Sequence, residues 1–393
     1  MSYQVEYRSF GSLLKNVVDN RGRSCPVEDQ GIPLIATNCI NNNQLYPVFE
    51  KIRYVSDDTY KNWFRSHPKP GDMVFVLKGT PGRVAWVPYP VNFCIAQDMV
   101  AIRADEKQIY PKYLFATLRS KMIQQEIEGL HVGTLIPHFK KGDFDDLKLP
   151  IVDNDLQKFI GDIYFNISLK IDLLHRQNIT LEAMAETLFR QWFVEEAQEY
   201  WDEYNLSDFA DHLKINMSPG KSPSDVFNHY SIPAYDEGIR PSKETGSQIL
   251  SNKYKVISWT ILVSKLNPKF PRIWPIGELV GDNNVCSTEF QIFKPKQKNL
   301  YGYIYFLLCS NDVKEEFIMA ASGTSGSHQR VRPEDILNIR TNLPSIELAE
   351  QYSVLVMPII KKTMANITQI RTLEKLRDTL LPKLMSGEVG VAT

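Results

Sequence analysis

Two segments of the chain place apolar residues at steps of three and four, the spacing of a long amphipathic helix. The first apolar series covers residues 156–192 and the second covers residues 348–384. Pro358 should kink the second helix, and Pro382 and Gly387 should mark its end. At about 1.5 Å per residue, each helix could reach on the order of 60 Å. Two such apolar stripes in one chain predict an antiparallel coiled-coil pair.

The rest of the chain predicts globular, mixed α/β domains. Runs that alternate or are rich in β-branched residues, bounded by Gly, Pro and Asn, predict strands at residues 72–79, 94–104, 253–263 and 287–294. One amphipathic helix is expected over residues 111–130 and one over 301–321, each followed by a Gly-Thr loop.

These patterns occur twice. "LEAMAETL" (181–188) returns as "LEKLRDTL" (373–380), and at an offset of 190, without gaps, residues 96–147 align with 286–337, which sets His138 against His328. A period near 190 residues is far longer than that of a solenoid repeat. A tandem duplication follows, with a pseudo-two-fold fold.

The predicted fold has four segments. Residues 1–150 and 201–344 should form two similar globular domains, and residues 151–200 and 345–393 the long antiparallel helices that separate them. The polar stretch 214–230 has no equally long counterpart in the first half, so the start of the second domain stays open.

Composition excludes some classes of protein. Five scattered cysteines without a C-x-x-C motif argue against a disulfide framework or a zinc site. The absence of a signal-like N-terminus and of a long apolar run predicts a cytoplasmic protein that does not cross a membrane. The net charge of −1 permits contact with a polyanion but does not demand it.

Catalytic motifs are missing from the sequence. Residues 267–270, Asn-Pro-Lys-Phe, resemble the Asn-Pro-Pro-aromatic loop of amino-group DNA methyltransferases, but Lys269 replaces the second proline. No glycine-rich loop for S-adenosylmethionine accompanies them, so a plain turn after a strand is the preferred interpretation. We therefore expect no enzyme and no metal site in this chain.

Polar loops at matched places in both halves carry hydroxyl and basic side chains that suit phosphate and base-edge contacts. The candidates of the first half are Arg21, Arg23, Lys78, Thr80, Arg83, Thr134, His138, Lys140 and Lys141. Those of the second half are Lys269, Arg272, Thr324, Ser325, His328, Gln329, Arg330 and Arg332. For any single residue, ordinary solvated loop charge is the alternative interpretation; recurrence in both halves favours a binding surface.

Two motifs make the chain resemble a known family. "LRDTLLPKLMSGE" (376–388) and "ETLFRQWFVE" (186–195), with the Gly-Thr loops and the following "LKLP" and "RTNLP", resemble the specificity subunit of Type I restriction–modification systems. The likeness covers the whole chain, because the two globular halves and the two long helices also match that family.

The resemblance implies a function. Each globular domain would be a target recognition domain that reads one half of a bipartite, asymmetric site in double-stranded DNA. The chain would also scaffold two methyltransferase subunits and the restriction subunits, without catalysing a reaction itself. S-adenosylmethionine, ATP and Mg²⁺ would be bound by those partners and no cofactor by this chain. The residues expected to contact the partners are Leu188, Phe189, Trp192, Phe193, Leu380, Leu381 and Leu384.

Three alternatives stay open at this point. A single-chain DNA methyltransferase or nuclease would need a cofactor domain for which the chain has no room. A coiled-coil scaffold with two protein-binding domains would not bind DNA. A Type IIB specificity subunit is a close variant. The DNA sequence and the gap between its half-sites do not follow from the residues, because base readout depends on loop geometry and water.

Overall fold

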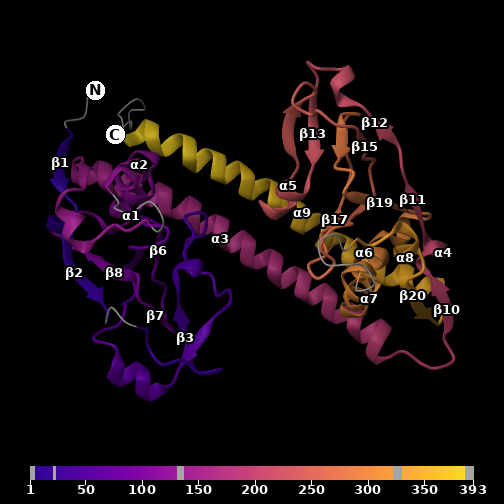
Figure 1. Ribbon diagram of the computed structural model, residues 1–393, viewed down its shortest axis with the longest axis horizontal. Coiled ribbons are helices and arrows are strands. Elements are labelled where there is room, and N and C mark those ends of the chain that lie inside the picture. The colour runs from indigo at the N-terminus through magenta and orange to yellow at the C-terminus, as the bar shows by residue number, and fades with distance from the viewer. Residues whose placement is uncertain (1–4, 21–23, 131–136, 322–329, 386–393) are drawn as a thin grey trace. The chain divides into compact units, whose positions relative to one another are not determined.

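The computed structural model describes residues 5–20, 24–130, 137–321 and 330–385 (Figure 1). The chain forms two compact units, which are described separately. Unit 1 contains Met1–Leu174 with Ile370–Thr393, and unit 2 contains His175–Gln369. Each unit therefore combines one globular part with a portion of both long helices.

Unit 1 is built on an antiparallel four-stranded sheet in the order β2-β8-β5-β6. These strands are Leu14–Asp19, Met99–Ala104, Met73–Val76 and Val84–Trp86. A three-stranded sheet, β4-β3-β7, contains Arg53–Val55, Ile32–Ile35 and Cys94–Ile95, and β3 pairs with β7 in parallel. Strands β1 (Glu6–Ser9) and β9 (Lys148–Ile151) pair with each other. Helices α1 (Pro111–Arg119) and α2 (Lys121–Leu130) follow β8.

Unit 2 repeats this plan. Its four-stranded sheet, β11-β19-β16-β17, contains Ala210–Leu213, Phe290–Pro295, Ile261–Ser264 and Ile273–Pro275. Its five-stranded sheet, β12-β15-β18-β13-β14, contains Asn216–Met217, Lys253–Lys255, Asn284–Cys286, Val226–Tyr230 and Ser242–Thr245. Strands β10 (Asp202–Asn205) and β20 (Arg340–Leu343) pair with each other. The helices are α4 (Leu206–Phe209), α5 (Ile232–Asp236), α6 (Tyr301–Cys309), α7 (Asn311–Ala321) and α8 (Pro333–Leu337).

The shared topology confirms the predicted duplication and the mixed α/β fold class. The four-stranded sheets have the same order, and β13 pairs with β18 in parallel as β3 does with β7. Unit 2 differs by two additional strands, β12 and β15, on the free side of β18. Strand β12 lies in the polar stretch 214–230, so the extra length in the second half widens this sheet.

Several predicted element boundaries were wrong. The single strands expected over 94–104 and 253–263 are each two strands in different sheets. The single helix expected over 111–130 is interrupted at Ser120, and that over 301–321 at Ser310. Both serines adopt extended backbone angles, and the Ser120 hydroxyl donates to Thr117 O at 2.7 Å. Such local side-chain bonds compete with helix propagation, which apolar periodicity does not report.

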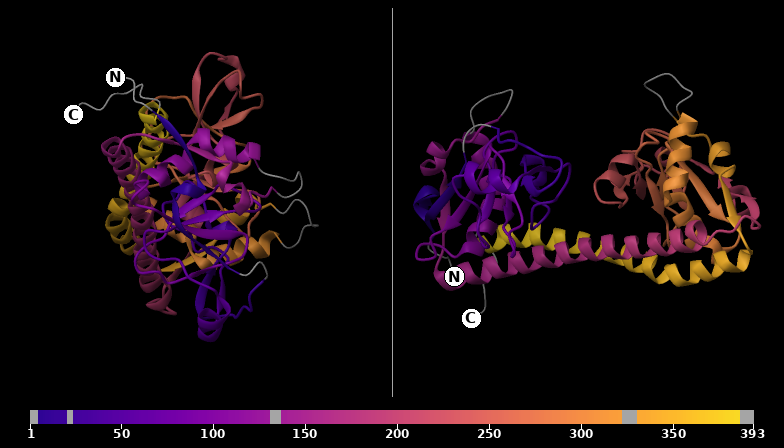
Figure 2. Two further views of the ribbon diagram at one scale, coloured as in Figure 1. Left: turned by 90° about the vertical axis from the view of Figure 1, so that its left-hand side faces the viewer. Right: turned by 90° about the horizontal axis from the view of Figure 1, so that it is seen from below.

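The long helices are α3 (Asn154–Arg190, 37 residues) and α9 (Ile346–Met385, 40 residues), and both can be followed in Figure 2. Helix α9 continues through Pro358, and its described part ends at Met385, between the two residues expected to mark its end, Pro382 and Gly387. The carbonyl that Pro358 leaves without a helical donor belongs to Val354, a residue that is 68% exposed. Water at that exposed face can satisfy it, as on the solvent side of curved helices.

The helices pair antiparallel within each unit, as predicted. In unit 1, Ile171 packs with Ile370, and the Arg377 guanidinium lies 5.8 Å from the centre of the Tyr164 ring. In unit 2, the Tyr352 hydroxyl donates to Ala185 O at 2.8 Å. Along α3, increasing residue numbers contact decreasing residue numbers of α9, as an antiparallel pair requires.

The globular part of each unit packs on the helices at a crossing that requires a small residue. In unit 1, a Cβ on Gly161 of α3 would lie 2.6 Å from Tyr113 N of α1. In unit 2, a Cβ on Gly302 of α6 would lie 3.1 Å from Ser353 Cα of α9. The glycine is on the long helix in one unit and on the domain helix in the other, so the close backbone approach is the common feature.

A buried asparagine pair interrupts the apolar seam of unit 2. The Asn366 amide nitrogen donates to Asn178 Oδ1 at 2.7 Å and to Gln177 Oε1 at 2.9 Å, and Asn366 is fully buried. A polar residue in a coiled-coil seam fixes the register at a cost in stability.

We therefore expect Asn366→Leu alone to lower the free energy of unfolding by about 1–3 kcal/mol, because the buried Asn178 carbonyl loses its donor. The double variant with Asn178→Leu should recover that loss or exceed the wild-type stability, since no buried polar group is left unpaired. Chemical denaturation of the two single variants and the double variant measures the coupling. Additive losses would contradict a paired role.

Candidate nucleic-acid interface

In unit 1, the turn after β5 is joined to the segment that follows α2. Lys78 and His138 form an isolated antiparallel bridge, in which Phe139 N donates to Leu77 O at 2.8 Å and Gly79 N to Pro137 O at 2.9 Å. Two predicted contact loops are therefore brought together at one end of the four-stranded sheet.

Unit 2 has the same bridge. Leu266 pairs with Arg330, and Val331 N donates to Lys265 O at 3.1 Å. Lys269 lies in the turn between β16 and β17, three residues after Leu266, and both it and Arg330 are exposed. The predicted basic residues of this turn and of the segment before α8 therefore share one edge, as in unit 1.

The matched bridges correct the predicted alignment. Lys140 N donates to Asp143 Oδ2 at 2.9 Å, and Arg332 N donates to Asp335 Oδ2 at 2.9 Å, each at the start of a short helix. Lys140 therefore corresponds to Arg332, and His138 to Arg330 instead of His328. The ungapped offset of 190 was wrong here, because α7 is one residue longer than α2 and the segment between that helix and the bridge is also one residue longer in unit 2.

Three of the predicted contact residues are held by carboxylates of their own unit. Arg272 forms a two-bond pair with Asp236, at 2.7 and 2.8 Å, and its side chain is only 17% exposed. Arg330 pairs with Glu289 at 3.0 Å but keeps 55% of its side chain exposed, and Lys141 pairs with Asp19. The structure thus gives Arg272 mainly a role in holding the turn, and leaves Arg330 accessible.

Side chains that sequence reasoning missed hold the turn of unit 1. The Gln124 amide donates to Gly82 O at 2.8 Å, and Asn42 Oδ1 accepts from Val84 N at 2.9 Å. The buried Arg119 guanidinium donates to Val84 O at 3.0 Å, and burial lowers its pKa to about 10. Nothing in the helical pattern of residues 111–130 marked these contacts, because their partners are backbone atoms distant in sequence.

Lys78, Thr80 and Arg83 are half-buried, whereas Lys140 and Arg332 are exposed. Arg83 directs Nη1 toward Ile40 O at 3.5 Å. Seven of the predicted contact residues lie outside the described residues: Arg21, Arg23, Thr134, Thr324, Ser325, His328 and Gln329.

The residues predicted to contact partner subunits belong to the chain's own cores. Phe189 and Phe193 lie in the core of unit 2, with Leu188 and Trp192 packed against it. Leu381 and Leu384 lie in the core of unit 1, with Leu380 packed against it. Phe189, Phe193, Leu381 and Leu384 are at most 8% exposed, so they leave almost no surface for a partner. Apolar periodicity marked buried positions correctly but did not tell an internal core from an interface.

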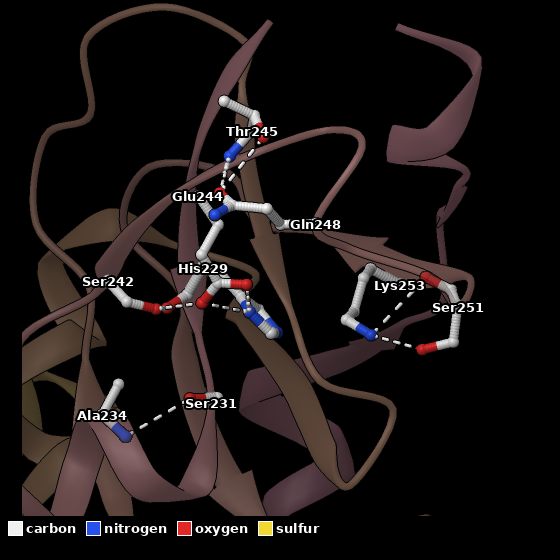
Figure 3. A network of polar contacts seen from close by, with 9 residues as sticks. All are labelled: His229, Ser231, Ala234, Ser242, Glu244, Thr245, Gln248, Ser251 and Lys253. Carbon is white, nitrogen blue, oxygen red and sulfur yellow. Dashed lines mark hydrogen bonds and ion pairs between the residues drawn. The ribbon is translucent and has the colours of Figure 1, made fainter. Parts of the chain in front are cut away.

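A separate polar network lies on the five-stranded sheet of unit 2 (Figure 3). His229 Nδ1 lies 3.0 Å from Glu244 Oε1, and the Ser242 hydroxyl donates to the same oxygen at 2.5 Å. Burial would raise the pKa of Glu244, but the hydrogen bonds from Ser242 and His229 outweigh it and lower that pKa. The network ties the edge strand β14 to β13 and is not part of the bridged surface.

Within the described ranges, no group of three or more His, Cys, Asp or Glu residues could hold a metal ion. Helices in that part of the chain are also too short or too polar to cross a membrane. Residues 267–270, which resemble a methyltransferase loop in sequence, form a turn in which Phe270 N donates to Asn267 O at 2.9 Å.

Comparisons with known proteins agree on one family. Residues 18–183 match the model of the Type I restriction modification DNA specificity domain. The Type I restriction enzyme MjaIX specificity subunit of Methanocaldococcus jannaschii is 22% identical over 395 residues, covering 92% of this chain and 87% of that protein. The HindI specificity subunit of Haemophilus influenzae is 24% identical over 182 residues, 46% of this chain and 39% of that protein. The crystal structure of an S subunit from M. genitalium shares the fold at a TM-score of 0.61, with 16% identity over 100% of this chain and 97% of that one.

The Arg272–Asp236 pair generates a prediction about stability and pH. The hydrogen bonds from Arg272 lower the pKa of Asp236, so the pair stabilises the folded state above the ordinary carboxyl pKa of about 4. That stabilisation is lost as the pH falls through the lowered pKa, because protonation then favours the unfolded chain. Asp236→Asn should lower the midpoint of thermal unfolding at neutral pH, and the difference from wild type should shrink below pH 4.

Asp282→Asn is the matched control, because Asp282 pairs with Lys255 at 2.8 Å but is 84% exposed. Calorimetry at several pH values should find little effect of this change. An equal effect of both substitutions would argue against a special role for Asp236.

Proposed function

We propose that this chain is the DNA specificity subunit of a Type I restriction–modification complex. Residues 18–183 match the model of the Type I restriction modification DNA specificity domain, and the motifs of the sequence resemble the same family. The observation that carries the proposal is the repeat of one plan across both units. The family model covers only residues 18–183, but unit 2 has the same sheet order and the same bridged turn. Two domains of one kind suit a bipartite DNA site, one half-site per domain.

The bridged surfaces have the chemistry that DNA binding requires. In unit 1 the surface carries Lys78, Thr80, His138 and Lys140, and in unit 2 it carries Lys269, Arg330 and Arg332. Cations on exposed loops neutralise phosphates, and hydroxyl, imidazole and guanidinium groups can address base edges. The backbone bridge is common to both units while the side chains differ, which fits two different half-sites.

In this proposal the chain recognises DNA and scaffolds, and its partners do the chemistry. Two methyltransferase subunits would supply S-adenosylmethionine, and the restriction subunits ATP and Mg²⁺. Tight binding of labelled S-adenosylmethionine by the purified chain alone would instead favour the single-chain methyltransferase.

Because the apolar face of α3 is buried in the chain's own cores, a partner subunit would contact the exposed side of this helical segment. Met184 of α3 is 52% exposed, and Val194, in the helical turn Gln191–Glu195 that follows α3, is 45% exposed. A cavity of about 250 Å³ in unit 2 is lined by Glu186, Arg190 and Asp312, among others. Apolar residues next to charged groups on an exposed helix face suit an interface with another subunit.

Removal of the matched cations Lys140 and Arg332 should weaken DNA binding in proportion to lost phosphate contacts. In the complex with the methyltransferase subunits, Lys140→Ala and Arg332→Ala should each reduce affinity for cognate DNA. Each should also flatten the logarithmic dependence of affinity on salt by roughly one unit per lost contact. Lys107→Ala is the control, because Lys107 is exposed beyond the opposite end of β8 from the bridge. Unchanged salt dependence in both variants would remove these loops from the contact surface.

Each domain should be an independent reader. A chimera that replaces residues 1–152 with the matching domain of a relative keeps the pairing of β1 with β9 and leaves α3, from Asn154, intact. The methylated sequence should then change in one half-site only, because base contacts are local to one domain. Methylome sequencing measures this outcome, and a change in both half-sites would contradict it.

A further inference from the structure

Phe270 is a large aromatic side chain held out into solvent. It is 70% exposed, more than Phe49 at 44% and Phe159 at 37%, which are the next most exposed phenylalanines among the described residues. Exposure of a phenyl ring forgoes the stabilisation that burial in an apolar core would give. An isolated exposed apolar residue is common on protein surfaces, but this one lies in a tightly held turn with basic neighbours.

The turn that carries Phe270 is tightly fixed. Phe270 N donates to Asn267 O at 2.9 Å, and Asn267 has a φ of 55°, a left-handed conformation that asparagine tolerates. The Ser264 hydroxyl accepts from Arg272 N at 3.0 Å, and Arg272 is itself held by Asp236. Together with Pro268 and Pro271 on either side of Lys269 and Phe270, these contacts leave the turn little freedom to lose on binding.

Basic residues flank the turn that carries Phe270, one within the turn and one across the bridge. Lys269 precedes Phe270 and is exposed, and Leu266, one residue before the turn, pairs with Arg330, whose side chain is 55% exposed. An aromatic ring among cations is the combination found where a protein contacts phosphates and bases together. An acidic partner protein would satisfy the cations, but it gives no reason for a preorganised ring on the surface that the proposed function assigns to DNA.

Unit 1 lacks this feature at the corresponding place. Gly79, with a φ of 84°, takes the position of Asn267, and the turn between β5 and β6 is one residue shorter. A Cβ on Gly82 would lie 3.1 Å from Ile127, so that end of the turn is packed down on α2. The exposed ring is therefore specific to the second domain.

We propose that Phe270 contacts a nucleobase in the half-site read by the second domain, as a further determinant of DNA specificity. This inference rests on the proposed function. The proposed contact is between the aromatic ring and a base, and two modes of contact have this chemistry. In the first, the ring inserts beside a base and unstacks it, as apolar wedges do; in the second, it packs against the 5-methyl group of thymine.

The test uses the chain assembled with its methyltransferase subunits and duplexes that carry the site defined by methylome sequencing. Each base pair of the site is replaced in turn, and affinity is measured for wild type, Phe270→Ala and Phe270→Tyr. Phe270→Ala should weaken cognate binding by roughly 5- to 100-fold, the range found for loss of one base–aromatic contact. Discrimination should flatten at one or two adjacent base pairs of the second half-site and stay unchanged in the first. Phe270→Tyr should retain most of both.

Val280→Ala is the matched control, because Val280 is 94% exposed in the same unit but lies in the connection between β17 and β18. It should bind and discriminate as wild type does. Thymine-to-uracil replacement separates the two modes of contact. If it lowers the affinity of wild type but not that of Phe270→Ala, the ring contacts the methyl group. A fluorescent adenine analogue that brightens with wild type and not with Phe270→Ala indicates unstacking.

The inference is overturned if Phe270→Ala discriminates every base pair as Val280→Ala does while wild type shows clear site preference. It is also overturned if Phe270→Ala impairs assembly with the methyltransferase subunits in gel filtration without DNA, since the ring would then serve a protein interface. A wild-type complex with no site preference at all would refute the proposed function instead.

Discussion

Each globular core is completed by side chains from both long helices, and the rest of the structure depends on this shared burial. In unit 1, Leu156 and Ile160 of α3 and Leu381 and Leu384 of α9 lie in the same core as the domain helix α1. In unit 2, Phe189 and other residues of both long helices lie in the same core as the domain helix α6. A domain helix can approach this closely only where one partner lacks a side chain. Gly161 and Gly302 meet that requirement from opposite sides of the crossing.

This packing positions the contact surfaces indirectly. Helix α1 rests on the long helices, and its last residue, the buried Arg119, donates to the backbone carbonyl of Val84, the first residue of β6 after the turn. The Ser120 break then starts α2, from which Gln124 holds Gly82. The turn is thus fixed by helices whose own places are fixed by the apolar seam. The exposed residues at its surface are free to vary without disturbing these supports, since supports and contacts involve different side chains.

The two units apply one backbone arrangement with different surface chemistry. Both join the turn after the central strand to the segment after the second domain helix by a short antiparallel bridge. In unit 1 the bridge carries Lys78 and His138, whereas in unit 2 it carries Leu266 and Arg330, and the turn beyond it presents Phe270. A pair of similar frames with unlike contacts is what recognition of an asymmetric, two-part DNA sequence requires.

The sequence alone determined the two long helices, their antiparallel pairing and the duplication, because each leaves a long periodic or repeated signal. Only the tertiary structure decided what the apolar positions are buried against. Periodicity marked Phe189 and Leu384 as apolar-face residues, but the face meets the chain's own cores instead of a partner. The two-residue shift that matches His138 with Arg330 was likewise hidden, because loop length changes leave no pattern until backbone hydrogen bonds define the register. Charge raised the same difficulty. In the sequence, Lys140 and Arg272 are both basic residues in polar loops. Only the position of Asp236 in the structure shows that Arg272 forms an ion pair within its own unit.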